Sequence, residues 1–542
     1  MSWLLPFPVL LPFVAAGAAM MAGRRQRMQA ALSIAALSLS LLVAVILAVA
    51  ASDAPVVLDV GSWAAPVGIS LVVDQLSGIM VVTSLAVSLV VLLFSIAQAA
   101  VDDGDSDAPS SVYHPVFHPT YLILCAGVAN AFLTGDLFNL YVGFEVLLAA
   151  SFVLLTLGGT AERIRAGAVY VVISLVGSLV FLGAIALTYA LTGTLSFAQL
   201  AVRLREVDPG AALLIQSLLL VAFGLKAAVF PLSAWLPDSY PTASAPITAV
   251  FAGLLTKVGI YAIIRTQVLL FPPSGADTVL GIAGIATMIL GIAGAIAQDD
   301  IKRILSFTLV SHMGFMLWGI VLGSREGVAA AIFYAVHHIL VQTTLFLVAG
   351  LIEQVAGTTS LTRLSSLASV STGLVVLYLV PALNLVGFPP LTGFLGKVGL
   401  ARASAQAATP LGWVMLGAGL VTSLLTLYVV VKMWTMAFWQ GADTPGADPK
   451  PAGGLRFNRA QLMAAPTAAL VVGTLALAAA ASPVYAYVER GADTLIQRTP
   501  YIEAVLTDGG RGSGDSSDAA GQNDGGPGLL LGEDVTAGKG ER

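Results

Sequence analysis

Residues 224–265 read GLKAAVFPLSAWLPDSYPTASAPITAVFAGLLTKVGIYAIIR, a stretch that sets lysines and prolines within long apolar runs. Lys226 and Lys257 each lie deep inside one of these runs. Pro231 and Pro237 follow the first lysine and interrupt its run, because proline lacks the backbone N–H that a continuous helix needs. The stretch therefore predicts a broken membrane helix followed by a second helix, each with a buried lysine.

The overall composition is that of an integral membrane protein. Of 542 residues, 57% are hydrophobic and 10% are charged, with a mean hydropathy of +0.91, whereas roughly a quarter of the residues of a soluble protein are charged. This composition excludes a separate globular catalytic module. The net charge of -5 argues against nucleic acid as a partner. The single cysteine, Cys125, excludes a disulfide framework, a cysteine-ligated zinc site and an iron–sulfur cluster, so we expect neither metal nor cofactor.

Apolar runs separated by charged, Pro/Gly or Ser/Thr-rich breaks predict an all-α membrane protein of about fourteen spans, since a span needs about 20 residues. The expected spans are 3–22, 30–51, 75–100, 119–134, 138–157, 167–192, 209–236 (interrupted), 246–270, 276–297, 304–323, 327–353, 370–403 (interrupted), 409–439 and 462–486. The polar end, 507–542, has too little apolar content to fold alone and is predicted to be a disordered tail.

The distribution of basic residues in short loops predicts the orientation in the cytoplasmic membrane. Most of these residues fall on one side of the predicted topology, which makes that side cytoplasmic and places both chain ends outside. The external loops between spans are expected to hold Arg203, Arg205, Arg265, Arg325 and Arg402.

Four charged residues lie deep within the predicted spans: Lys226, Lys257, Lys397 and, among the acids, Glu145. A charge at the bilayer centre costs at least about 2.5 to 3.5 kcal/mol on insertion scales. A cost of this size indicates that the four charges have a function. Because burial destabilises an ammonium ion and a nearby carboxylate stabilises it, such a lysine can take up and release a proton. Glu145 is the expected partner of Lys226. The alternative is that the lysines snorkel to the interface or are neutral in the bundle core.

Histidines extend this set of titratable groups. His337 and His338 lie in the span 327–353, and Gln342 follows His338 on the same helix face. Since histidine titrates near neutrality, both are candidate relay groups. A hydrogen-bonded core role is the alternative for each of them.

A second broken span is predicted where Pro389 and Pro390 precede Lys397. Broken helices that carry polar residues in two halves of a chain are typical of inverted repeats around an ion route at the membrane midplane. We therefore expect a lateral proton route from Glu145 and Lys226 through Lys257 and the histidines to Lys397.

Five ordered motifs between residues 70 and 440 resemble the D subunits of Mrp-type multisubunit sodium/proton antiporters, a family similar to the antiporter-like membrane subunits of respiratory complex I. The motifs are the opening stretch, GDLFNLYVGFEVLLAASFVLLTL (135–157), QDDIKRILSFTLVSHMG (298–314), VHHILVQTTLFLVAG (336–350) and GFPPLTGFLGKVGL (387–400).

The resemblance implies fourteen helices with two inverted five-helix repeats, formed by the fourth to eighth and ninth to thirteenth spans, each with one broken helix. By position, it assigns proton translocation to Glu145, Lys226, Lys257 and Lys397. Related sequences commonly carry a lysine after the histidine pair, where this chain has Gln342, which leaves His337 or His338 to serve in the central relay. The start of the tenth span, in SFTLVSHMG, is also less hydroxyl-rich than usual.

The same resemblance divides the chain into N-terminal helices (1–118), an antiporter core (119–439), a segment with a loop, the last helix and an amphipathic stretch (440–506), and the tail (507–542). It predicts a transporter subunit of the cell membrane that works with other membrane subunits, protons and a monovalent cation such as Na⁺. The alternative is a proton-pumping subunit of a complex I or membrane hydrogenase type redox assembly. The sequence does not identify the cation or the subunit through which it crosses.

Overall fold

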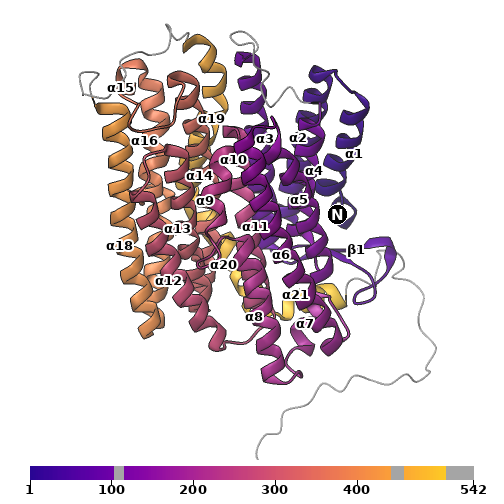
Figure 1. The fold of residues 1–542 in the computed structure, drawn as a ribbon. Helices are drawn as coiled ribbons and strands as arrows, with labels where there is room; N and C mark the ends of the chain where they lie inside the picture. Colours follow the sequence, from indigo (N-terminus) through magenta and orange to yellow (C-terminus); the bar gives the residue numbers. More distant parts are fainter. Residues whose placement is uncertain (103–114, 441–456, 508–542) are drawn as a thin grey trace, which may run out of the picture.

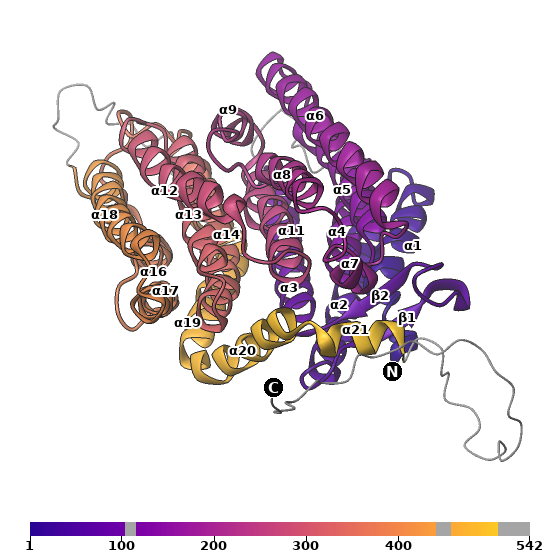
Figure 2. The same cartoon turned by 90° about the horizontal axis from the view of Figure 1, so that it is seen from below.

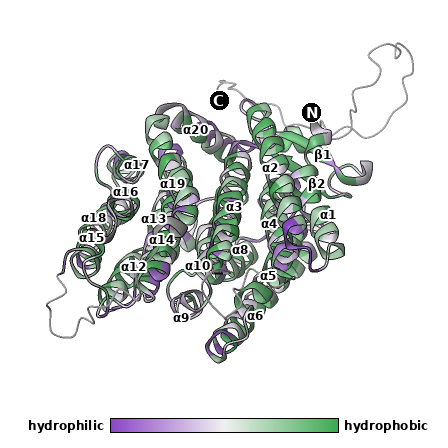
Figure 3. Cartoon of the chain, turned by 90° about the horizontal axis from the view of Figure 1, so that it is seen from above, coloured by the Kyte–Doolittle hydropathy of each residue, from purple (hydrophilic) through white to green (hydrophobic). Residues whose placement is uncertain are grey.

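The computed structural model describes residues 1–102, 115–440 and 457–507, which form a bundle of long helices (Figure 1). Hydrophobic residues cover most of the length of these helices (Figure 3). Within the described residues, 12 helical segments are long and apolar enough to cross a membrane. The predicted tail lies outside the described residues, except for Thr507.

The spanning segments follow one another along most of the chain. They are α1 (Phe7–Met21), α2 (Gln26–Ala50), α3 (Gln75–Asp102), α5 (Leu137–Thr156), α6 (Ala161–Thr192), α8 (Pro209–Lys226), the continuous stretch α10–η5–α11 (Ala245–Leu269), α12 (Gly275–Ile296), α13 (Ile301–Leu322), α14 (Arg325–Ala356), α18 (Pro410–Met433) with η6 (Trp434–Trp439), and α19 (Phe457–Ala479). Two shorter apolar helices, α4 (Phe117–Leu133) and α16 (Thr372–Val386), occupy places where spans were expected. The all-α membrane fold is thus confirmed, while the count of fourteen spans, the inverted repeat and the domain limits stay predictions.

Both predicted helix breaks are present. Helix α8 ends at Lys226, and helical backbone resumes only at α9 (Trp235–Ser239). Helix α16 ends at Val386, and α17 (Thr392–Ala407) begins after Pro389 and Pro390. Proline has no backbone N–H and cannot donate the hydrogen bond of a continuous helix. The chain therefore leaves helical geometry after Lys226 and before the helix that carries Lys397.

The C-terminal segment departs from the expected span 462–486. Helix α19 ends at Ala479, and α20 (Ala481–Gln497) and α21 (Thr499–Leu506) run across one end of the bundle (Figure 2). The Tyr487 hydroxyl donates to the carbonyl of Ala48 at 3.0 Å. The short antiparallel strands β1 (Val56–Asp59) and β2 (Ser70–Val73) lie at the same end and were not expected from the sequence. The segment therefore connects helices from both halves of the chain.

A buried ion pair lies close to this end. Arg265 of α11 donates to both carboxylate oxygens of Asp74 at 2.5 and 2.9 Å, and each side chain is 1% exposed. The guanidinium group also donates to the Tyr261 hydroxyl and lies 5.2 Å from the centre of the Tyr501 ring. The expectation that Arg265 lies in an external loop is wrong, because the helix continues past it and Asp74 satisfies its charge.

We expect Arg265→Gln to lower the free energy of unfolding by roughly 3 to 5 kcal/mol, because it leaves the Asp74 carboxylate buried without its counter-charge. The double variant Asp74→Leu/Arg265→Met removes both charges and is expected to lose less. Equilibrium unfolding of the purified chain in mixed detergent micelles measures both. The control is Arg325→Gln, which breaks a partly exposed pair with Asp493 that is worth about 1 kcal/mol or less. Equal losses in the Arg265 and Arg325 variants would contradict the expectation.

Candidate functional site

Glu145 and Lys226 meet through a serine that the sequence analysis missed. The Ser178 hydroxyl of α6 donates to a carboxylate oxygen of Glu145 on α5. The Lys226 ammonium group donates to the Ser178 hydroxyl at 2.9 Å and to the carbonyl of Ser174 at 3.0 Å. No direct ion pair within 4.0 Å joins Glu145 and Lys226, both of which the structure describes. The expected charge pair is thus bridged by one hydroxyl group.

The position of Lys226 follows from the local fold. It is the last residue of α8, so its charge lies at the helix end where free carbonyl groups favour a cation. The side chain is 6% exposed, while Glu145 is half-buried. Ser174 and Ser178 are four residues apart in an apolar span and therefore share one helix face. That spacing is the sequence signal that could have identified them.

Lys257 is fully buried beside an irregular part of its own span. Residues Phe251–Leu255 form a π-helical segment, η5, between α10 (Ala245–Val250) and α11 (Thr256–Leu269). The Lys257 ammonium group donates to the carbonyl of Ala252 in this segment at 2.6 Å. Single π-helical turns inside α-helices are frequent at functional sites. Here the turn provides the acceptor for a cation that has no carboxylate partner among the described residues.

An aromatic cluster of three histidines and a tyrosine follows. The Tyr334 hydroxyl of α14 forms a 2.8 Å hydrogen bond with Nδ1 of His312 on α13. The His338 ring stacks on His312 with 5.3 Å between ring centres, and the centre of the His337 ring lies 5.2 Å from that of Tyr334. Both ring nitrogens of His338 have no hydrogen-bond partner among the described residues. Helix α11, which carries Lys257, packs against both α13 and α14, the helices of this cluster.

The second broken helix contacts the histidine cluster. Nδ1 of His337 forms a 2.8 Å hydrogen bond with the Thr392 hydroxyl at the start of α17, and that hydroxyl donates to Asn384 Oδ1 at 3.0 Å. The Lys397 ammonium group donates to the carbonyls of Leu385 and Val386 at 3.2 and 2.8 Å. These are the last two residues of α16, so the break supplies the acceptors.

The predicted residues thus fall into two groups. Glu145 and Lys226 form one with Ser178, and the other contains Lys257, His337, His338 and Lys397. Among the described residues, no hydrogen bond joins Lys226 to Lys257. A cavity of about 10 Å³, roughly the room that one water molecule needs, lies beside Lys226 and reaches Leu255, two residues before Lys257.

Gln342 does not bring a charge into the second group. Its amide nitrogen donates to the carbonyl of Leu305 at 2.7 Å, and its oxygen has no partner among the described residues. Nor does the described part of the chain contain three or more His, Cys, Asp or Glu side chains placed to hold a metal ion. The charged members of the second group are therefore its two lysines, Lys257 and Lys397.

Comparisons with known proteins identify the family of the chain. A family model described as NADH:quinone oxidoreductase/Mrp antiporter, TM, matches residues 134–426. The D subunit of the Na(+)/H(+) antiporter of Alkalihalophilus pseudofirmus is 38% identical over 510 residues, which are 93% of this chain and 100% of that protein.

Two solved structures share the fold. A chain of the Mrp complex from Dietzia sp. matches with a TM-score of 0.84 and 31% identity, over 93% of this chain and 100% of that chain. A chain of respiratory complex I from Thermus thermophilus matches with a TM-score of 0.69 and 23% identity, over 88% of this chain and 98% of that chain. The resemblance drawn from the motifs is confirmed: the chain is a multi-pass membrane protein that belongs to the NADH:quinone oxidoreductase/Mrp antiporter family.

Proposed function

We propose that this chain is the proton-translocating subunit of a multisubunit antiporter that exchanges a monovalent cation, Na⁺, for protons across the cell membrane. The observation that carries the proposal is the Lys226–Ser178–Glu145 arrangement at the end of a broken helix. The names of its relatives support antiport, and the full-length match to a chain of an Mrp complex supports assembly with other membrane subunits. The likeness to complex I is a likeness of fold, so the redox-coupled alternative has the weaker support.

In this proposal, the bridge controls the proton on Lys226. The protonated lysine is stabilised by two acceptors and, through Ser178, by the negative charge of Glu145. When the carboxylate is neutralised or the hydroxyl turns away, the ammonium ion loses most of its compensation in a medium of low dielectric constant. The proton is then released toward the next group that can accept it.

The second group provides the rest of the route. The helix of Lys257 packs against the two helices of the histidine cluster. Neither ring nitrogen of His338 is hydrogen-bonded within the described residues, so its one basic nitrogen can accept a proton without breaking an existing hydrogen bond. His337 continues through Thr392 toward the break that holds Lys397. Water has to bridge Lys226 and Lys257, and the small cavity beside Lys226 is the first place for it.

The cation is expected to cross elsewhere. A cation site needs several oxygen ligands around one point. Among the described residues, no three His, Cys, Asp or Glu side chains are placed to hold a metal ion. We therefore place the cation path on a partner subunit or at an interface with one.

The direct test of the proposed function is cation transport after a pH jump in vesicles that contain the whole complex, made with the wild-type chain and with Lys226→Ala.

Glu145→Gln and Lys226→Ala are each expected to reduce antiport at least about tenfold, because either change removes a charged hydrogen bond worth about 1.5 to 3 kcal/mol. Glu145→Asp keeps the charge and is expected to be milder. The measurement is the initial rate of pH-driven cation uptake at equal complex content. Glu162→Gln, at an exposed position on α6, is the control. Uptake near the wild-type rate in either main variant would remove the pair from the mechanism.

Ser178→Ala tests the bridge itself. It removes the hydroxyl that connects Glu145 and Lys226 and leaves both charges in place, so we expect antiport to fall by about tenfold, as for the loss of one charged hydrogen bond. Ser178→Thr keeps the hydroxyl and is expected to retain most of the activity. Ser423→Ala, which removes a hydroxyl bonded only to its own helix, is the control. The bridge is dispensable if Ser178→Ala and Ser423→Ala transport alike.

Thr392→Val tests the connection from the histidines to the second break. Valine keeps the shape of threonine but cannot bond to His337 or Asn384, so we expect slower antiport with unchanged assembly. Proton-uptake rates and gel filtration of the complex measure the two properties. Thr467→Val, which removes a hydroxyl that donates to the carbonyl of Met463 in its own helix, is the matched control. Unchanged transport in Thr392→Val would separate His337 from the proton route.

A further inference from the structure

A cavity of about 520 Å³ opens at the end of the bundle where α11 ends and α12 begins. The end of α13 and the joint between α20 and α21 complete its wall. One part of the lining is apolar and includes Val268, Phe271 and Ile496, while the other part carries Arg205 and Arg498. In the predicted orientation this is the external side of the membrane. The cavity is separate from the lysines and histidines of the proposed proton route.

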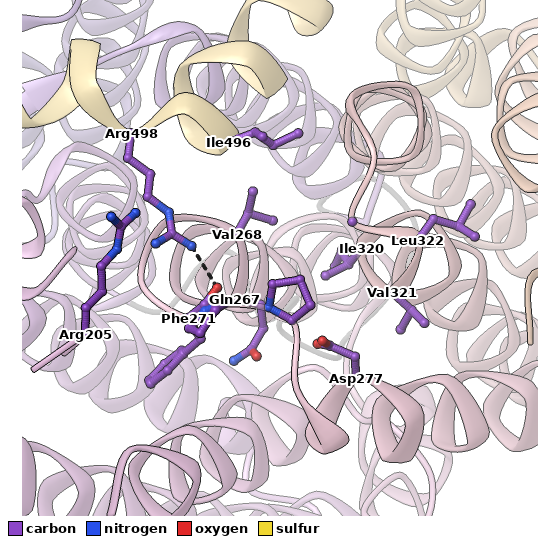
Figure 4. A pocket seen from close by; sticks show the side chains of 13 residues that line it. Arg205, Gln267, Val268, Phe271, Asp277, Ile320, Val321, Leu322, Ile496 and Arg498 are labelled. Atoms are coloured by element: carbon purple, nitrogen blue, oxygen red, sulfur yellow. Dashed lines mark hydrogen bonds between the residues drawn. The ribbon is translucent and has the colours of Figure 1, made fainter. Parts of the chain in front are cut away.

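Two guanidinium groups lie side by side in this cavity (Figure 4). Arg498, between α20 and α21, is 9% exposed, and within the described residues its guanidinium group donates to the carbonyl of Phe271 at 2.9 Å. Arg205 is exposed. Among the described residues, no carboxylate lies within 4.0 Å of either group. Burial and the charge of Arg205 both lower the pKa of Arg498, as expected for two cations without a shared anion.

The same cavity is also lined by a buried amide, whose nitrogen points away from the two arginines (Figure 4). Gln267 of α11 is 7% exposed, and its side-chain oxygen accepts a hydrogen bond from Gln216 at 2.7 Å. This bond fixes the orientation of the amide, and its nitrogen has no partner among the described residues. A buried donor without an acceptor is costly, so an acceptor from outside the chain is favoured there.

The acid in the cavity does not neutralise the arginines. Asp277 accepts a hydrogen bond from the backbone of Ser274 at 2.8 Å, as part of the cap of α12. It lies on the opposite side of the cavity from Arg205 and Arg498 (Figure 4). The end of the cavity that holds the arginines is therefore positively charged and rich in donors.

We propose that this cavity binds a phosphate group through Arg205 and Arg498. A guanidinium group matches the geometry of phosphate oxygens, and Arg498 has four N–H donors left after its bond to Phe271. The apolar lining next to these donors suits the glycerol and upper acyl region of an anionic phospholipid. A free phosphate ion carries the same oxygens, so the test separates the two sources.

The backbone supports a dedicated role for Arg498. It is a non-glycine residue with a φ of 63°, and it is the single residue between two helices. Such a conformation is strained and persists only where the surroundings enforce it. The bend directs this arginine into the cavity instead of into water.

The test uses the purified full chain in phosphatidylcholine nanodiscs with increasing fractions of phosphatidylglycerol. Native mass spectrometry counts the phosphatidylglycerol molecules that are retained. A second arm titrates inorganic phosphate at constant ionic strength, with the thermal unfolding temperature as its readout. The variants are Arg205→Gln and Arg498→Gln, and Arg402→Gln is the matched control, an exposed arginine expected on the same side.

We expect the wild type and Arg402→Gln to respond alike, and Arg205→Gln to bind about tenfold more weakly, because one charged hydrogen bond is lost. Because Arg205 has no partner within the described residues, its variant is expected to fold even if Arg498→Gln does not. A response to phosphatidylglycerol alone identifies a lipid, and a response to inorganic phosphate identifies a free anion. No response to either probe, or the same response in wild type and Arg205→Gln, overturns the proposal.

Discussion

The arrangement of the core depends on how three lysines within membrane helices obtain hydrogen-bond acceptors. Intact helices consume their own carbonyl groups, so an ammonium ion in a bilayer needs an interrupted helix or a polar side chain. Lys397 bonds to the last two carbonyls of α16, and Lys257 bonds to a carbonyl in the π-helical turn. Lys226 ends its own helix and lies at the negative pole of the helix dipole. The two helix breaks and the π-helical turn are thus each located at a lysine.

The three lysines differ in the charge around them. Among the described residues, Lys226 is the one of the three with a carboxylate nearby, and that carboxylate acts through a hydroxyl group that can turn. Lys257 and Lys397 are held by neutral carbonyl groups, whose dipoles do not change when a proton moves. A change at Glu145 therefore alters the stability of the charge on Lys226 directly and reaches the other two lysines only through a moving proton. This difference gives the proposed route one controlled step followed by relay steps.

Much of the fold could be predicted, because a membrane helix must be long and apolar and therefore leaves a clear pattern in the sequence. Long apolar runs located the helices, and prolines beside Lys226 and Lys397 located both breaks. The remainder depends on contacts between distant segments. Ser178 looks like any small residue of a packed helix until α5 and α8 are placed against it, and Arg265 looks like a loop residue until Asp74 is brought from 191 positions away. The π-helical turn before Lys257 has no proline or glycine pair to announce it, since only its hydrogen-bond pattern is unusual.

The buried groups without partners indicate where protons can go. A protonated lysine can pass its proton on only to a group that has a free lone pair. Net proton movement therefore requires a neighbour with an unused lone pair. His338 is fully buried, and neither of its ring nitrogens is bonded within the described residues. Leaving a polar ring unsatisfied in a packed core costs stability, and selection for packing alone would replace it with an apolar side chain. The cost is explained if His338 is bonded while a proton passes, which makes the histidine cluster a relay between Lys257 and Lys397.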